Sequence, residues 1–134
     1  AMRFLFVLIL GIYLTYGQGY SLYQLGSGID GEADGDRSGI SLSLSTDGSR
    51  LAIGADSNGG NGVQAGHVRV YKYNNGGWSQ IGADINGKAT GERTGHAVSL
   101  SADGNRLALG AVKADGNGND AGVARVYDYS NGAW

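Results

Sequence analysis

Large side chains alternate with serine, alanine or glycine along two neighbouring segments of the chain, residues 40–45 and 51–55. The same alternation returns at residues 96–101 and 107–111. A period of two places successive side chains on opposite faces of a β-strand. No segment combines apolar residues at helical spacing with the residues that cap a helix. The pattern therefore predicts an all-β protein.

An internal repeat accounts for this recurrence. Sliding the sequence by 56 positions places Tyr23–Trp78 on Ser79–Trp134 without a gap, and 30 of the 56 pairs are identical. Gly54, for example, falls on Gly110. Identity at this level over a fixed period is typical of a repeat architecture.

Each repeat unit is predicted to contain four strands. The first is 21–25 or 78–81, the second 40–45 or 96–101, the third 51–55 or 107–111, and the fourth 67–73 or 123–129. Glycine- and asparagine-rich loops, 56–66 and 113–122, separate the third strand from the fourth.

The turn residues support these strands. Asp47-Gly48 and its equivalent, Asp103-Gly104, predict a tight two-residue turn with positive φ between the second and third strands. Asn75-Gly76 and Asn131-Gly132 predict the turns that follow the fourth strand.

Four antiparallel strands in each of two units predict two β-propeller blades, residues 19–77 and 78–134. On the third strand Leu51 and Ile53 share one face while Ala52 and Gly54 share the other, as a sheet packed between two neighbours requires. Propellers have about four to eight blades, so two blades are expected to belong to a larger or oligomer-completed propeller.

Two families share these features. The stretch SLSADGNRLALGA, followed by GVARVYDY, resembles the second to fourth strands of WD-repeat blades, in which an Asp-Gly turn precedes a Leu-Ala strand. TGHAVSLS with LALGA and GVARVY is similar to FG-GAP repeats, the blades of integrin α-subunit propellers and related secreted proteins. The resemblance covers residues 20–134 and implies the propeller fold.

The chain departs from the FG-GAP pattern where that family binds calcium. FG-GAP blades commonly carry an aspartate-rich calcium loop between the second and third strands, but here only STDGSR and SADGNR stand there. These turns are too short to supply six to eight oxygens. The proline of the family's name is replaced by Asp56 and Val112. The family's calcium site is therefore not carried over.

Residues 1–18 are predicted to be a secretory signal peptide. Arg3 precedes an apolar run from Phe4 to Leu14, and small and polar residues follow as far as Gln18. The run is shorter than the roughly 20 residues that cross a bilayer. An uncleaved anchor and a buried strand are the alternatives. We expect a secreted or extracellular protein, which without cysteine depends on packing instead of disulfides.

Two oxygen-rich stretches are candidate calcium sites, although a solvated loop is the favoured interpretation of both. The candidates are Asp30, Glu32, Asp34 and Asp36 in the first stretch, and Asp115, Asn117, Asn119 and Asp120 in the second. No other cofactor is expected.

The sequence does not support catalysis or nucleic-acid binding. The net charge of −2 offers no basic field for nucleic acid or an anionic membrane. The two histidines, His67 and His96, align with Val123 and Ile40, which indicates positions that accept apolar packing. No serine, histidine and carboxylate set is marked for nucleophilic catalysis, so we expect no enzyme.

Repeated arginines and tryptophans are predicted to be structural. Arg69 and Arg125 alternate with tyrosines on the fourth strands, where a guanidinium can stack on a ring and bond loop backbone. Trp78 and Trp134 are expected to pack between blades. An exposed recognition stripe of arginine and tyrosine is the alternative.

The function expected from these features is a secreted or cell-surface binding or adhesion module. Its ligand would be a protein or carbohydrate held by the loops 56–66 and 113–122, because connecting loops carry function. Its other partners would be further blades in the same or another chain. The alternatives are a self-assembling component of an extracellular fibre or wall, and a fragment of a propeller hydrolase.

Overall fold

The computed structural model describes residue 19 and residues 21–134, and this part of the chain contains strands and no helix. The strands are β1 (Ser41–Leu44), β2 (Arg50–Ala55), β3 (His67–Asn74), β4 (Gly77–Gln80), β5 (Ile85–Asn86), β6 (Thr94–Leu100), β7 (Arg106–Ala111) and β8 (Val123–Asp128). The predicted all-β class is confirmed. The predicted signal peptide, residues 1–18, lies outside the described residues. In the described part, no helix has the length and apolarity needed to cross a membrane.

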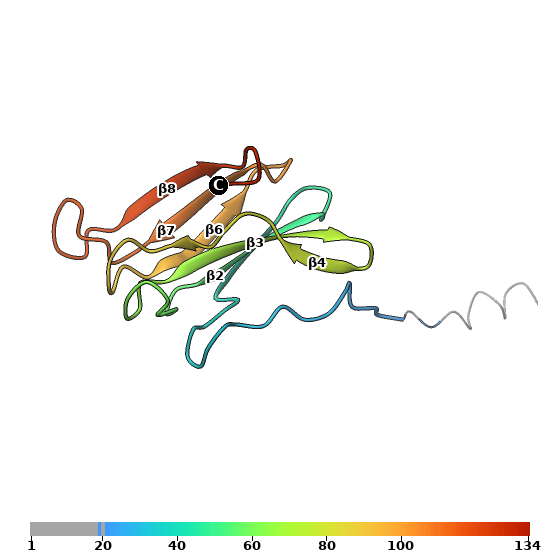
Figure 1. Ribbon diagram of the computed structural model, residues 1–134, viewed down its shortest axis with the longest axis horizontal. Helices are drawn as coiled ribbons and strands as arrows, with labels where there is room; N and C mark the ends of the chain where they lie inside the picture. Colours follow the sequence, from blue (N-terminus) through green and yellow to red (C-terminus); the bar gives the residue numbers. More distant parts are fainter. Residues whose placement is uncertain (1–18, 20) are drawn as a thin grey trace, which may run out of the picture.

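The strands form two open antiparallel sheets. In the first sheet β1, β2, β3 and β4 follow one another, and β5 pairs with the other end of β3. The second sheet has the order β6-β7-β8. Leu44 pairs with Leu51 in the first hairpin, and Leu100 pairs with Leu107 in the second. Figure 1 shows the two sheets stacked on each other. Among the described residues they do not close into a barrel or ring.

The predicted first strands differ from expectation. Residues 21–25 form no strand. The segment 78–81 is extended as β4, but it completes the first sheet instead of opening the second, with Trp78 opposite Tyr73 on β3. The reason is local: a two-residue turn at Asn75-Gly76 folds the following residues directly back onto β3.

The two kinds of turn have different geometries. Asn75 (φ 50°) and Gly76 (φ 84°) are both left-handed, as a two-residue hairpin turn requires. The Ser45 N–H donates to the Arg50 carbonyl, so the Asp47-Gly48 connection is instead a four-residue loop, 46–49. In it Gly48 (φ 70°) is left-handed and Asp47 is not. Its turn hydrogen bond runs from the Gly48 N–H to the Ser45 carbonyl over 2.9 Å. The prediction of a two-residue turn there was wrong, because Asp47 uses its side chain to accept bonds from Ser45 and Ser49 instead of taking a left-handed backbone.

Left-handed backbone recurs at equivalent positions of the two units. Arg37 (φ 60°) matches Arg93 (φ 56°), and Gln64 (φ 54°) matches Asp120 (φ 50°). Every positive-φ residue among those described has such a partner 56 positions away. Residues other than glycine rarely adopt this backbone conformation. The two units therefore share the backbone conformation of their loops as well as their sequence.

The face of the first sheet that carries small side chains, called here the small face, packs against the second sheet. Gly54 lies so close to Gly95 of β6 that an added Cβ would overlap the Gly95 carbonyl oxygen. Ser41 Oγ donates to this oxygen over 2.7 Å, and Ser43 Oγ accepts from the Leu100 N–H over 2.9 Å. The core between the sheets contains Ala52, Val68, Val70, Ile85, Leu107 and Leu109.

The opposite face of the second sheet is open, and that of the first sheet is open along β1, whereas Ile53 and Tyr71 on the same face are buried. On the first sheet, Leu42 is 60% exposed and Leu44 is 57% exposed. The outer face of the second sheet has a shallow hollow lined mainly by small residues, including Ala97, Ser99 and Gly110. One outer face is therefore bulky, and the other is small.

Candidate functional site

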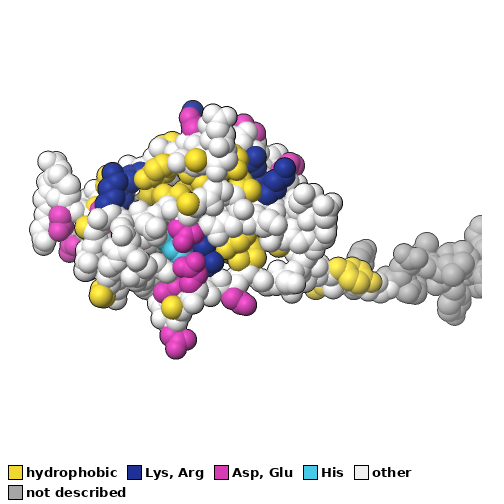
Figure 2. Space-filling model, in the orientation of Figure 1, with side chains coloured by type: hydrophobic (Ala, Val, Ile, Leu, Met, Phe, Trp, Pro, Cys, Tyr) yellow, Lys and Arg dark blue, Asp and Glu magenta, His cyan; other side chains and the backbone are white. Residues whose placement is uncertain are grey.

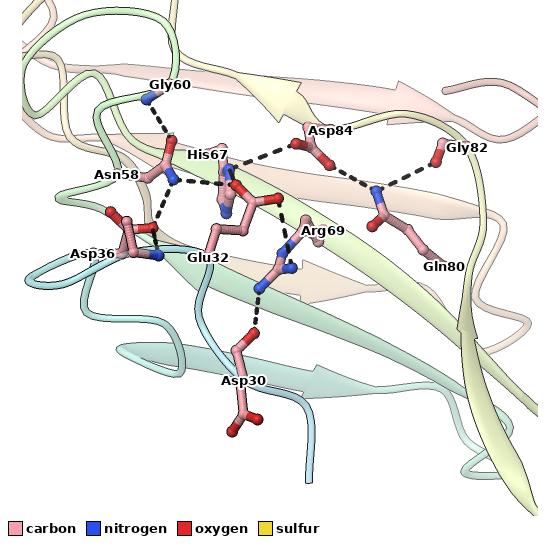
Figure 3. Close-up of polar contacts among 11 residues, drawn as sticks. Asp30, Glu32, Asp36, Asn58, Gly60, His67, Arg69, Gln80, Gly82 and Asp84 are labelled. Atoms are coloured by element: carbon pink, nitrogen blue, oxygen red, sulfur yellow. Dashed lines mark hydrogen bonds and ion pairs between the residues drawn. The ribbon is translucent and has the colours of Figure 1, made fainter. Parts of the chain in front are cut away.

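An acidic cluster centred on a histidine lies at one end of the first sheet. Glu32 lies in the loop before β1, His67 begins β3, and Asp84 lies between β4 and β5. Because β5 pairs with β3 at His67 and Val68, the connection that carries Asp84 is held beside the histidine. Figure 3 shows both carboxylates directed toward His67, and we name these residues the Glu32–His67–Asp84 cluster.

The imidazole of His67 is buried without a hydrogen bond at Nδ1. His67 is 1% exposed, and its Nδ1 has no hydrogen-bond partner among the residues that the structure describes. The nearest carboxylate oxygens are Glu32 Oε2 at 3.7 Å and Asp84 Oδ2 at 3.9 Å. Both separations exceed hydrogen-bonding distance. The nitrogen is therefore directed into a space between two carboxylates.

Neighbouring side chains hold the carboxylates in place. Gln80 Nε2 donates to Asp84 Oδ1 over 2.7 Å, which leaves Oδ2 facing His67. Arg69 Nη1 lies 3.7 Å from Glu32 Oε1, the oxygen that faces away from His67. Each carboxylate thus directs one oxygen toward the space at Nδ1 while a neighbour restrains the other. Glu32 Oε2 also accepts a long hydrogen bond from Asn58 Nδ2, over 3.4 Å.

The charge state of His67 follows from burial. Burial lowers the pKa of His67, the carboxylates of Asp84 and Glu32 act in the opposite direction, and Arg69 lowers it again. The net effect is a pKa of His67 below its ordinary value, because desolvation outweighs the carboxylates. Neutral imidazole is the form that coordinates metal ions.

The loop that carries Glu32 is anchored by a buried carboxylate. Asp36 is 5% exposed, and its Oδ2 accepts from Asn58 Nδ2 over 2.8 Å and from the Ala33 N–H over 3.1 Å. Asn58 belongs to the loop after β2, so this pair joins the loop before β1 to the first sheet and thereby positions Glu32. Figure 2 shows the resulting surface, where acidic side chains surround a histidine beside a basic group.

The structure separates the candidate calcium ligands. Of the first stretch only Glu32 joins the cluster, since Asp36 is committed to Asn58 while Asp30 and Asp34 are exposed. Turns bend this stretch, so a two-residue spacing does not bring its carboxylates together. The second stretch, Asp115, Asn117, Asn119 and Asp120, is exposed throughout. There Asp115 Oδ1 accepts from the Asp120 N–H over 2.7 Å, which closes the loop on itself.

The arginines tie loops to strands. Arg69 lies over the Tyr71 ring at 5.7 Å, and its Nη2 donates to the Asp30 carbonyl over 2.8 Å. Arg125, at the equivalent position, donates to both carboxylate oxygens of Glu92, over 2.8 Å and 3.2 Å. Both guanidinium groups therefore hold the loop that precedes the first long strand of their own sheet.

The tryptophans make one contact twice. Trp78 Nε1 donates to the Leu25 carbonyl over 2.9 Å, and Trp134 Nε1 donates to the Ile81 carbonyl over 3.0 Å. Each ring also packs against a tyrosine, with centroids 5.2 Å apart for Tyr73 and Trp78. Each tryptophan thus fixes the extended segment that begins its repeat unit.

Sequence reasoning missed two members of the cluster. The sequence predicts apolar packing at His67 and marks no role for Asp84. A signal was nevertheless present in the repeat, because all three members depart from their equivalents in the other unit. Glu32, His67 and Asp84 align with Lys88, Val123 and Gly28. Departures from a repeat that each add a metal-coordinating atom are the pattern to search for.

Comparison of the sequence with known protein families and with curated proteins found no match.

Proposed function

We propose that the chain is a non-catalytic β-propeller module, whose two sheets are neighbouring blades and whose loops bind a protein or carbohydrate ligand outside the cell. The observation that carries the proposal is the contact between the sheets. In it the small face of the first sheet packs against the face of the second sheet that carries large side chains, Leu107 and Leu109 among them. In a propeller, every blade makes this contact with the next.

The two open faces are equivalents of the two faces already in contact. Ser99 and Gly110 on the open face of the second sheet align with Ser43 and Gly54, which face the second sheet. Leu42 and Leu44 on the open face of the first sheet align with Val98 and Leu100, which pack against the core. Each open face therefore has the shape that complements the other.

The partner that fits these faces is a second copy of this chain. Joining the small face of one copy to the bulky face of the next is a head-to-tail interface, which forms a ring if the rotation closes. Three or four copies would supply six to eight blades, within the usual range of about four to eight.

A polar contact between the two sheets indicates how the next copy could be contacted. Arg50 Nη1 donates to the Gly104 carbonyl over 3.0 Å and to Asn105 Oδ1 over 2.6 Å. Its equivalent, Arg106, has a side chain 64% exposed, and its Nε and Nη2 donate to Asp128 over 2.6 Å and 2.9 Å. In a ring, Arg106 would reach the turn at Gly48 of the next copy.

The ligand class rests on the resemblance to FG-GAP and WD-type repeats. The loops 56–66 and 113–122 follow equivalent strands, β2 and β7, and so would lie on the same side of a ring. Loops presented by a rigid scaffold commonly recognise ligands. Binding to immobilised glycans and extracellular-matrix proteins, compared before and after replacing each loop with glycine and serine, tests this part.

The assembly is tested by light scattering of residues 19–134 over a range of concentrations. We expect a discrete species of three or four copies. A folded monomer at every concentration would overturn the proposed ring. Open-ended growth would instead favour the second candidate, a structural component of a fibre or wall, which uses the same two faces without closing them.

A further inference from the structure

We propose that the Glu32–His67–Asp84 cluster binds a divalent first-row transition metal ion, of which zinc is the representative. The ligands are His67 Nδ1, Glu32 Oε2 and Asp84 Oδ2. This site is independent of ring assembly, because all three side chains come from the first sheet and its connections.

The geometry leaves room for an ion. Nδ1 is 3.7 Å from one carboxylate oxygen and 3.9 Å from the other, and all three atoms lie within 4.8 Å of one another. Zinc lies about 2.0–2.2 Å from nitrogen and oxygen ligands, so two of its ligands are separated by more than hydrogen-bonding distance. Two ligands of a tetrahedral zinc ion lie about 3.3–3.5 Å apart, so the two nitrogen–oxygen separations would have to contract by about 0.2–0.6 Å. The two carboxylate oxygens, which lie within 4.8 Å of each other, would have to approach as well.

The buried nitrogen is the second, independent indication. An unsatisfied polar atom inside a protein costs free energy, so most buried polar atoms bond to a protein group, a water molecule or an ion. At Nδ1 of His67 no group of the described residues is within bonding distance, and the nearest charged atoms are two carboxylate oxygens. The Arg69 guanidinium lies beside Glu32 Oε1, and its Nε is likewise buried without a partner among the described residues. A cation satisfies the nitrogen and both carboxylates together.

The surrounding side chains have the arrangement that orients metal ligands. Carboxylates that bind metals are commonly hydrogen-bonded through their other oxygen. Gln80 performs this role for Asp84, and Arg69 contacts the outer oxygen of Glu32. Arg69 also donates to the Asp30 carbonyl, so its position is fixed without the cluster.

The donor set favours zinc-like ions over calcium. Calcium takes six to eight oxygen ligands, whereas this site offers two carboxylate oxygens and one imidazole nitrogen. Zinc, cobalt and related ions accept this mixture, and three protein ligands leave a position for water. Access is open, since the side chain of Glu32 is 45% exposed and that of Asp84 is 30% exposed.

An ion at this site would join three parts of the chain. Glu32 belongs to the loop before β1, His67 to β3, and Asp84 to the connection between β4 and β5. Metal binding is therefore expected to stabilise the folded chain, because an ion that binds only the folded state shifts the folding equilibrium.

The repeat supplies variants that are compatible with the fold. Val123 occupies the position equivalent to His67, and Lys88 the position equivalent to Glu32. His67→Val therefore removes the nitrogen with a residue that the other unit accepts at the same place. Glu32→Gln removes a half-exposed charge with little change in shape. Asp34→Asn, in the same acidic stretch and outside the cluster, is the matched control.

The test is zinc titration of the full chain by calorimetry and by competition with a chromophoric chelator at pH 7.5, with thermal unfolding recorded in parallel. We expect one zinc ion per chain and a higher unfolding temperature with zinc. Affinity should fall by at least about tenfold in His67→Val and in Glu32→Gln and stay unchanged in Asp34→Asn. Excess calcium should not displace the ion.

Cobalt substitution provides a direct view of the ligands. Bound Co²⁺ should show a visible spectrum of nitrogen and oxygen coordination that His67→Val abolishes. Absence of zinc binding by the folded wild-type chain would overturn the proposal. Equal zinc affinity in the wild type and in a folded Glu32→Gln would overturn it as well, which keeps the test decisive if His67→Val fails to fold.

Discussion

Asp56 Oδ2 lies 2.8 Å from Nδ1 of His96, and this contact joins the loop after β2 to β6 of the second sheet. The Asp56 side chain is fully buried, and Arg37 Nη1 lies 3.4 Å from its other oxygen. Arg93 Nη1, from the loop before β6, lies 3.9 Å from Asp56 Oδ2. One buried anion thus gathers three cationic or protonatable groups from both repeat units.

Replacing Asp56 with asparagine should weaken the junction between the sheets. Breaking a fully buried ion pair costs about 3–5 kcal/mol. The side chains of Arg37 and His96 are 48% and 46% exposed, so water can solvate them after the change. We therefore expect a loss of about 2 kcal/mol in the free energy of unfolding, measured by urea denaturation. Asp34→Asn should change it by less than about 0.5 kcal/mol; similar losses in both variants would contradict the assignment.

Two equivalent glycines should respond differently to alanine. At Gly54 an added Cβ would overlap the Gly95 carbonyl oxygen and the Ser41 hydroxyl oxygen. Gly54→Ala must therefore push the sheets apart, at a cost of about 1–3 kcal/mol. At Gly110 the nearest atom is the Ala97 Cβ at 3.7 Å, so Gly110→Ala should leave the stability of the chain unchanged. Urea denaturation of both variants measures the difference.

Gly110→Ala also separates chain stability from assembly. If the open small face docks onto another copy as Gly54 docks onto Gly95, the added methyl group should block that contact. Light scattering should then detect monomers of normal stability. A variant that assembles as the wild type does would show that Gly110 lies outside the interface.

Glu92 should contribute to acid sensitivity. Its burial alone would raise its pKa, but hydrogen bonds from Arg125, the Lys88 N–H and Thr94 outweigh burial and hold the pKa below the ordinary value. A lowered folded-state pKa adds stability that is complete above the unfolded value of about 4.3 and is lost as pH falls through the folded value. Glu92→Gln should be less stable at pH 7 by about 2 kcal/mol, and the difference should shrink below pH 4. Denaturation at several pH values measures this. A difference that is constant with pH would contradict it.

The Asp47 turn should titrate at unusually low pH. The Ser49 N–H and the hydroxyls of Ser45 and Ser49 lower the pKa of Asp47 to about 2. The stabilisation that these bonds provide is complete above the unfolded value of about 3.9 and is lost as pH falls toward 2. Carboxyl NMR should detect a midpoint near pH 2. In Ser45→Ala/Ser49→Ala the pKa should rise but stay below the ordinary value, because the Ser49 N–H remains.

Asp103 is an internal reference for the same experiment. Its pKa is lowered by the Asn105 N–H and by the Ser101 hydroxyl. It should keep its low midpoint in the variant of the first turn. A shift of both aspartates together would indicate loss of the fold instead of loss of two hydrogen bonds.

Most strands were predictable because their causes are local. Alternation over a few residues sets which faces a strand presents, and Asn75-Gly76 requires a tight reversal whatever lies nearby. The same locality explains the error at Asp47-Gly48, where side-chain bonds to Ser45 and Ser49 compete with the expected backbone geometry. The turn propensity of Asp-Gly alone does not decide between a two-residue turn and a four-residue loop that the Asp47 side chain stabilises.

By itself, the sequence determined the all-β class, the repeat, most of the hairpins and the division of β2 into small and large faces. Only the tertiary structure decided that β4 completes the first sheet, that Gly54 meets Gly95, and that His67 lies between Glu32 and Asp84. The physical reason is distance along the chain. Turn and strand preferences act over a few residues, whereas the position of an oxygen at residue 32 relative to a nitrogen at residue 67 depends on how loops and sheets pack.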